Sequence, residues 1–260
     1  MLELSGPDSS VRVDPLMGGR VASLRIGGTE VIVGPTSESG TPRDPFEWGM
    51  YPMVPFAGRI RRGRFTFAGE DHALPARRPP HAIHGTVDQV PWEVDSVDRS
   101  SVVLGSGLGG EWPFDGRVTH EMSLGNRQFE CVLSLTAGET MPAQVGWHPW
   151  FRRPATVAAG FAEWLPRDLD GMPGAPTTIG IPDLAGSVDD CFVAGALAVS
   201  INVDGLDLTL ESDCSHWVVY TGASHGVCVE PQSGPPNEIE ASPFILRAGR
   251  TLRRRFMISW

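Results

Sequence analysis

Glycine and proline interrupt the chain from end to end, and this feature constrains the fold most strongly. The 260 residues include 31 glycines and 23 prolines, about a fifth of the chain, against roughly an eighth in average proteins. Proline lacks a backbone donor and glycine is conformationally free, so both end regular structure. Because they are spread throughout, little room remains for long helices, and short strands joined by turns are expected.

Several segments between these breaks alternate apolar and polar residues. The alternation is clear over residues 118–124, 129–136 and 206–211, and a period of two indicates a strand with one buried face. Residues 217–220 are continuously apolar, which predicts a strand buried on both faces. Residues 244–246 and 251–260, joined by a turn at 247–250, predict a closing hairpin. Residues 155–163 allow a short helix at most, and residues 166–182 predict a long loop.

Domain organisation follows from what the chain lacks. It shows no fixed-period repeat, low-complexity tract or linker-like change in composition. Hydrophobic residues make up 41% of it, which is enough for a packed core. We therefore expect one all-β domain over residues 1–260, a large antiparallel β-sandwich or a distorted barrel.

Charge and cysteine usage limit the partners. A net charge of −10 repels phosphate backbones and anionic lipid, so neither nucleic acid nor membrane is expected as a partner. The arginines at 59–64 and 253–255 are interpreted as exposed strand ends. The N-terminus lacks signal-peptide features, and four scattered cysteines without a CxxC pair predict buried, reduced thiols. A cytoplasmic protein is expected, while the oligomeric state cannot be predicted.

Two of the seven histidines have unusual surroundings. His84 precedes Gly85, and His148 lies within Gly146-Trp147-His148-Pro149-Trp150-Phe151. An imidazole flanked by glycine, proline and aromatic residues sits at a turn and can point into a pocket, where it acts as an acid or a base near neutral pH. The alternative is a hydrogen-bonded core histidine, which remains open for both.

A metal site at His81-x-x-His84 has little support. Pro79 and Pro80 indicate an extended chain, in which the two imidazoles face opposite sides. No carboxylate or cysteine nearby completes a ligand set, so no metal is expected. A nucleophilic triad lacks its G-x-S-x-G motif, and the glycines at 105–110 lack the context of a phosphate-binding loop and are interpreted as turn residues.

Glu230 is the most distinctive carboxylate. It ends the apolar run at 226–229 and precedes Pro231, which holds it in extended conformation. Partial desolvation there would raise its pKa toward that of a useful base, although an ordinary surface glutamate is the alternative. Asp189 and Asp190 adjoin an aromatic residue, a setting suited to binding hydroxyl groups or to an exposed turn.

Taken in order, these segments resemble motifs of the aldose 1-epimerase (galactose mutarotase) family, over nearly the whole chain. Each motif is weak alone, but their shared order and spacing are hard to obtain by chance. The matching segments are Met17–Leu24, Pro55–Gly69 (P-x-x-N-R-I-x-x-G-x-F), His84–Trp92 (H-G-G), Gly146–Phe151 (H-P-Y-F), Asp189–Phe192 (D-x-x-F), Glu230–Gly234 (E-P-Q-T-G) and Leu246–Trp260.

The resemblance implies a galactose mutarotase-like supersandwich and a sugar mutarotase that needs no cofactor. Glu230 would be the general base at the anomeric hydroxyl, and His148 the general acid at the ring oxygen. His84 would hydrogen-bond the ring oxygen or a neighbouring hydroxyl. The implied sugar-binding residues are Arg59, Asp189, Trp150 and Gln232.

Three positions depart from the family pattern. Gly58 replaces an asparagine and could loosen Arg59, Thr86 replaces a glycine, and Trp150 replaces a tyrosine. These departures leave the identity of the sugar undetermined.

Two rival functions remain: a hexose-6-phosphate mutarotase, with Arg77 and Arg78 as possible phosphate ligands, and a catalytically inactive carbohydrate-binding or regulatory domain.

Overall fold

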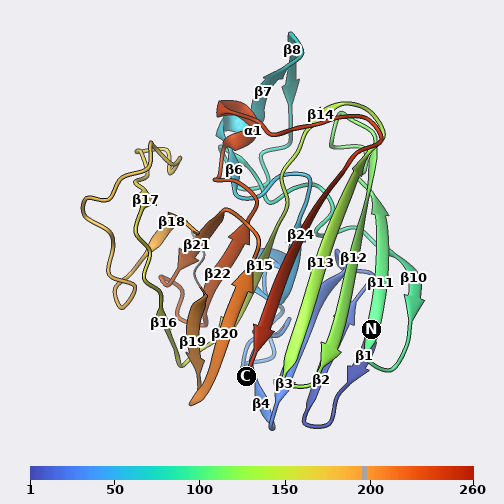
Figure 1. Ribbon diagram of the computed structural model, residues 1–260, viewed down its shortest axis with the longest axis vertical. Coiled ribbons are helices and arrows are strands. Elements are labelled where there is room, and N and C mark those ends of the chain that lie inside the picture. Colours follow the sequence, from blue (N-terminus) through green and yellow to red (C-terminus); the bar gives the residue numbers. More distant parts are fainter. Residues whose placement is uncertain (195–197) are drawn as a thin grey trace.

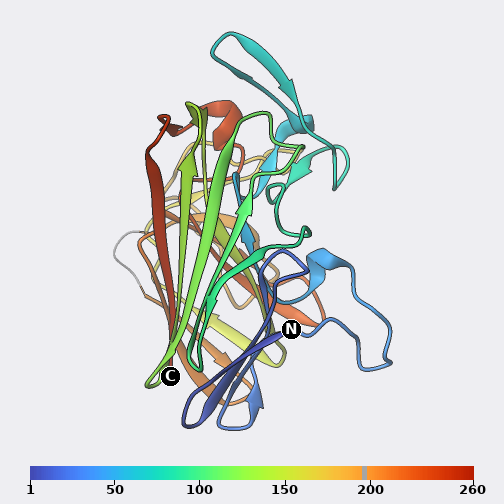
Figure 2. The same ribbon diagram turned by 90° about the vertical axis from the view of Figure 1, so that its right-hand side faces the viewer.

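Two large antiparallel sheets make up most of the protein. The computed structural model describes residues 1–194 and 198–260, and within these residues a ten-stranded and an eight-stranded sheet lie in two layers (Figures 1 and 2). The expected all-β antiparallel sandwich is confirmed. Whether residues 1–260 form one domain stays a prediction.

The ten-stranded sheet carries the central strands that matter for function. Its order is β1-β2-β3-β5-β15-β22-β21-β18-β17, with β4 beside β3. Its strands are β1 (Leu2–Ser5), β2 (Ser9–Asp14), β3 (Arg20–Ile26), β4 (Thr29–Glu30), β5 (Met50–Met53), β15 (Gly146–Arg152), β17 (Trp164–Leu165), β18 (Asp189–Val193), β21 (His216–Tyr220) and β22 (Gly226–Gln232).

The eight-stranded sheet has the order β10-β11-β12-β13-β24-β20-β19-β16. Its strands are β10 (Glu93–Val97), β11 (Ser101–Gly107), β12 (Gly116–Gly125), β13 (Gln128–Ala137), β16 (Ala155–Ala158), β19 (Val199–Val203), β20 (Leu206–Ser212) and β24 (Thr251–Ser259).

Short pairs and helices complete the described residues. The pair β7–β8 projects from one end of the molecule (Figures 1 and 2). The pairs are β6 (Arg59–Ile60) with β9 (Ala82–Ile83), β7 (Arg64–Phe67) with β8 (Glu70–Ala73), and β14 (Met141–Pro142) with β23 (Ile245–Leu246); the helices are two 3-10 turns, Pro45–Glu47 and Arg61–Gly63, and α1 (Glu238–Ala241). None of the helices described is both long and apolar enough to cross a membrane.

Alternation along the strands separates a core face from an outer face. On β15, Trp147 and Phe151 belong to the main core, which also takes buried residues from the eight-stranded sheet. Trp150 points the other way and packs in a separate cluster with Tyr51 and Cys228. Since side chains alternate across a strand, the outer face of the ten-stranded sheet is left to carry polar groups.

Several sequence predictions hold in detail. The alternating segments lie in β12, β13 and β20, and the apolar run at 217–220 lies in β21, with Trp217, Val218 and Val219 buried. Residues 166–182 lie in the connection between β17 and β18. All four cysteines are buried and free of disulfides, as predicted.

Four local predictions are wrong. His148 lies inside strand β15 and not at a turn, because β15 pairs with β5 and β22 on either side. Residues 155–158 form strand β16, because they pair with β19. The predicted closing hairpin is absent from the described residues, since β23 pairs with β14 while β24 pairs with β13 and β20. Gly105 and Gly107 lie in β11 rather than in a turn. In each case a partner distant in sequence decided the local structure, which periodicity alone does not reveal.

Candidate active site

The outer face of the central strands brings the acid–base candidates together. The register pairs His148 on β15 with Tyr51 on β5. It also pairs Gly146 with Gln232 and Trp150 with Cys228, so His148 lies opposite Glu230 on the same face. The sheet itself therefore juxtaposes an imidazole and a carboxylate that are 82 positions apart in the sequence.

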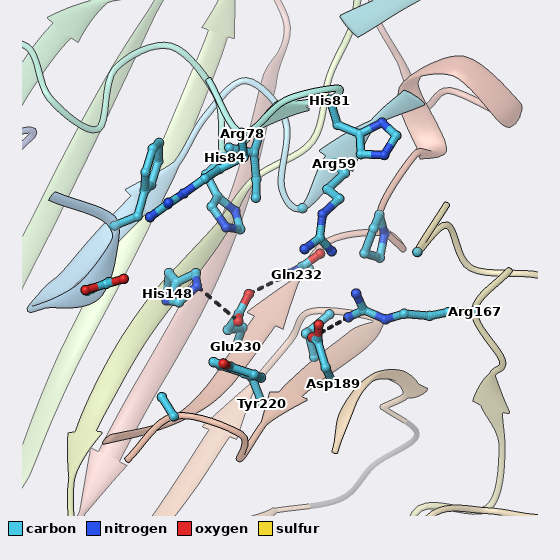
Figure 3. A pocket seen from close by; sticks show the side chains of 18 of the residues that line it. Arg59, Arg78, His81, His84, His148, Arg167, Asp189, Tyr220, Glu230 and Gln232 are labelled. Atoms are coloured by element: carbon cyan, nitrogen blue, oxygen red, sulfur yellow. Dashed lines mark hydrogen bonds and ion pairs between the residues drawn. The ribbon is translucent and has the colours of Figure 1, made fainter. Parts of the chain in front are cut away.

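His148 and Glu230 form a buried pair. The Nε2 of His148 lies 3.2 Å from Oε1 of Glu230 (Figure 3), and the side chains are 7% and 4% exposed. Burial, reinforced by the charge of Asp189, raises the pKa of Glu230 to about 8. Burial also lowers the pKa of His148 to about 3. Both shifts disfavour charge, so near neutrality the pair holds one transferable proton.

Two rings enclose the imidazole of His148. Tyr51 stacks on it with ring centroids 4.7 Å apart, and His84 meets it edge-on at 4.8 Å. His84 has a φ of 59°, and its backbone N–H donates to Gly58, which turns its ring toward His148. Burial, followed by the charge of His148, lowers the pKa of His84 well below its usual range.

Two ring nitrogens beside the pair lack partners. The Nδ1 atoms of His84 and His148 are buried and have no hydrogen-bond partner among the described residues. Buried polar atoms are nearly always satisfied in folded proteins. Two buried nitrogens beside the pair are thus left unsatisfied by the described residues.

Arg59 reaches the site from β6. Its pKa is lowered by burial and by the nearby charge of Arg167, and it forms no ion pair with any described residue. The preceding Gly58 has a φ of 66°, and a Cβ there would approach Pro236 to within 2.6 Å. Glycine at this departure from the family pattern is thus required by close packing.

Asp189 stands at the start of β18, beside the cavity. Its Oδ1 accepts from Nη2 of Arg167 at 2.7 Å (Figure 3). Asp190 is 3.9 Å from Arg167 and is not among the residues that line the cavity. Of the two adjacent acids, Asp189 is therefore the one that faces the site.

Trp150 and Gln232 complete the predicted set. Trp150 is 4% exposed, and its indole N–H donates to the carbonyl of Phe46 at 2.8 Å. Gln232 is fully buried, and its amide donates to Oε2 of Glu230 at 3.0 Å. Trp150 thus forms a wall, and Gln232 holds the carboxylate in place.

All the predicted site residues line one cavity of about 750 Å³. Part of its rim comes from residues 167–171, where Arg61 donates to Asp168 and Asp170 at 2.5 Å each. Arg78 also lines it and pairs with Asp44 at 3.1 Å. The volume lies within the range for small-molecule sites.

Arg77, which the sequence offered as a phosphate-binding residue, lies outside the cavity. It donates to the buried Asp88 at 2.6 Å and to the carbonyl of Gly85 at 3.0 Å. It is not among the cavity-lining residues. These contacts fix the segment that follows His84.

Possible metal ligands also meet here. Donor atoms of His148, Cys228 and Glu230 lie within 4.8 Å of one another. Burial raises the pKa of Cys228 well above its usual range, and a metal needs the thiolate. Two of these three groups, His148 and Glu230, already contact each other. At the His81-x-x-His84 motif, where no metal is expected, Nδ1 of His81 accepts a hydrogen bond from the backbone N–H of Arg62 at 3.0 Å.

Comparison with known proteins agrees with the motifs. The sequence model of the aldose 1-epimerase family matches residues 2–259. The chain belongs to the aldose 1-epimerase family. The uncharacterized protein YphB of Escherichia coli (strain K12) is 28% identical over 170 residues, which are 57% of this chain and 57% of that relative. The match thus spans less than two thirds of the relative's length.

Solved structures of this family share the fold. The GalM/aldose epimerase homologue from C. elegans superposes with a TM-score of 0.86 at 14% identity, over 99% of this chain and 97% of that one. The galactose 1-epimerase from Lactobacillus acidophilus NCFM superposes with a TM-score of 0.79 at 18% identity, over 98% and 92%. At such identities the likeness shows the fold alone.

The sequence analysis did not predict several cavity residues, among them Arg167 and Tyr51. Arg167 lies in the long connection before β18, where the sequence shows no periodicity that could place it. Tyr51 follows Met50 in a short apolar strand, and its contact with His148 depends on a sheet register. One signal was available for Tyr51, because the chain has only two tyrosines.

Proposed function

We propose that the protein is an aldose 1-epimerase that interconverts the α and β anomers of a free aldose. The observation that carries this proposal is the buried His148–Glu230 pair, with its 3.2 Å separation, at a cavity large enough for a sugar. A carboxylate and an imidazole so placed supply a base and an acid to adjacent atoms of one ring.

The reaction needs only proton transfers. The Glu230 carboxylate takes the proton of the anomeric hydroxyl, the O–H electrons form the C1=O bond, and the C1–O5 bond breaks. Protonated His148 gives its proton to O5. The open aldehyde rotates about C1–C2 and closes from its other face, with both protons returning. Arg59 and Asp189 would bind hydroxyl groups, and His84 would assist at the ring oxygen.

A phosphorylated substrate is the second candidate. Arg59, Arg78 and Arg167 line the cavity, and guanidinium groups bind phosphate well. Asp44 and Asp189 already pair with Arg78 and Arg167, which favours a neutral sugar.

The cytoplasmic location expected from the sequence stays a prediction.

Polarimetry tests both candidates. Freshly dissolved α-glucose and α-galactose should lose their excess rotation faster with the protein than without it. Faster equilibration of glucose 6-phosphate alone would favour the second candidate. Binding of a sugar without acceleration of any would contradict the enzyme and favour the inactive domain.

A further inference from the structure

A second cavity of about 690 Å³ adjoins the first, and His225 lines both. No part of the proposed mutarotation uses it. Its lining is rich in guanidinium and hydroxyl groups, and the residues that carry them are Arg43, Arg152, Arg153, Thr36, Ser37, Ser39 and Ser224.

Rigid backbone builds much of this cavity. Arg152 is the last residue of β15 and pairs with Gly226 of β22. Its N–H donates to the carbonyl of Val31 at 2.9 Å, and the N–H of Val33 donates to the carbonyl of Trp150 at 2.9 Å. These two hydrogen bonds fix residues 31–33 beside the end of the sheet, and residues 34–43 continue from there. Arg152 and Arg153 are thus carried by the end of β15, while the N–H of Arg43 donates to the carbonyl of Pro35 within the 34–43 segment.

The positive charges of this cavity are largely uncompensated. Arg43 and Arg152 form no ion pair with any residue in the described ranges, and the buried Nε of Arg43 has no hydrogen-bond partner there. Arg153 donates only to neutral carbonyls, those of Ala223 at 2.9 Å and Thr221 at 2.6 Å. Glu38 is the one acid among the lining residues described. Three arginines thus line one cavity, although the net charge of the whole protein is −10.

Hydroxyl groups line the same cavity as these cations. Oγ of Ser37 lies 2.8 Å from Oγ of Ser39, and both residues line the cavity. Guanidinium and hydroxyl donors together are the chemistry that recognises an oxyanion with several acceptor oxygens. We propose that this second cavity binds a phosphate group, either free phosphate or the phosphate of a small metabolite.

Titration calorimetry with inorganic phosphate, at about pH 7.5 and constant ionic strength, tests the site. Arg43→Ala and Arg152→Ala should each weaken binding about tenfold or more, the loss expected for one charge-assisted contact. Arg152 is exposed, so its variant keeps the test valid if Arg43→Ala fails to fold. Arg12→Ala, an exposed arginine on β2, should leave binding unchanged.

Two further arms locate the phosphate and identify its source. Phosphate should shift the NMR signals of the His225 ring and leave those of His84 unmoved, because His225 lines the second cavity and His84 lines only the first. Tighter binding of glucose 6-phosphate than of phosphate would assign the group to a metabolite, and the reverse to the free ion. No measurable binding, or binding abolished by Arg59→Ala but kept in Arg43→Ala and Arg152→Ala, would overturn the proposal.

Discussion

At the scale of single residues, the site depends on two groups whose charged forms are both disfavoured. Burial raises the pKa of Glu230 to about 8 and lowers the pKa of His148 to about 3. Because the side chains are 3.2 Å apart, they titrate as one unit. The form competent for ring opening carries a single proton, with the carboxylate as base and the imidazolium as acid.

The pH profile of mutarotation follows from this shared proton. The His148–Glu230 pair holds the shared proton from about pH 3 to about pH 8. The value of kcat/KM should therefore be level between roughly pH 5 and 7 and fall above about pH 8. The falling limb reports loss of the acid. Rates measured at constant ionic strength that instead keep rising through pH 9 would contradict the shared-proton state.

The same shift makes stability depend on pH. Glu230 binds its proton up to about pH 8 when folded and up to 4.5 when unfolded, so the free energy of unfolding falls as the pH rises between these values. Glu230→Gln removes this fall and should gain roughly 4 kcal/mol relative to the parent between pH 5 and 9. Urea unfolding at both pH values measures the difference. Parallel curves for the two proteins would show that the carboxyl is not desolvated.

Sequence reasoning reached most of this site because its residues lie in recognisable segments. His148, Glu230 and Arg59 were each marked by flanking proline, glycine or a family motif. Tyr51 and Arg167 were not, because one is placed by cross-strand register and the other by a long connection without periodicity. Their positions depend on contacts between distant segments.

At the scale of elements, the connection between β17 and β18 shapes the open side of the cavity. Residues 168–171 line it, and Arg61, just after β6, holds Asp168 and Asp170. These ion pairs are partly exposed, so they contribute little to global stability. Their effect should be to position the rim.

Arg61→Ala should therefore weaken substrate binding more than catalysis. We expect KM to rise roughly threefold to tenfold, with kcat within about twofold and the free energy of unfolding nearly unchanged. Arg64→Ala, at an exposed residue of the neighbouring β7, is the matched control and should leave all three values as in the parent. A fall in kcat with constant KM would contradict a positioning role for this rim.

Elements were predicted well where the pattern was local. The alternating strands β12, β13 and β20 were expected, whereas β16 and the pairing of β23 and β24 were not. Alternation identifies a strand and its buried face. It does not identify the partner strand, which decided the structure where these predictions failed.

At the scale of the whole molecule, one sheet serves two purposes. The inner face of its central strands packs into the core shared with the eight-stranded sheet, and the outer face carries the site. Neighbouring residues of β22 should therefore affect different properties. Val229 belongs to the core and should affect stability, whereas Glu230 lines the site and should affect activity.

Val229→Ala tests this separation. Removing two methyl groups from the fully buried core should cost about 1–3 kcal/mol of unfolding free energy, measured by urea denaturation. The kcat/KM of the folded variant should stay within about twofold of the parent. A large loss of activity in a folded Val229→Ala protein would show that the two faces are coupled.

The most direct test of the acid–base pair compares Glu230→Gln and His148→Asn with the parent by polarimetry of α-glucose or α-galactose, whichever the parent equilibrates faster. Glu230→Gln keeps the side-chain size, His148→Asn keeps a smaller planar polar group, and circular dichroism checks the fold of both. Each should lower the mutarotation rate by about 10²–10⁴-fold, the usual contribution of a placed acid or base. Folded variants that equilibrate the sugar as fast as the parent would contradict the assignment of His148 and Glu230.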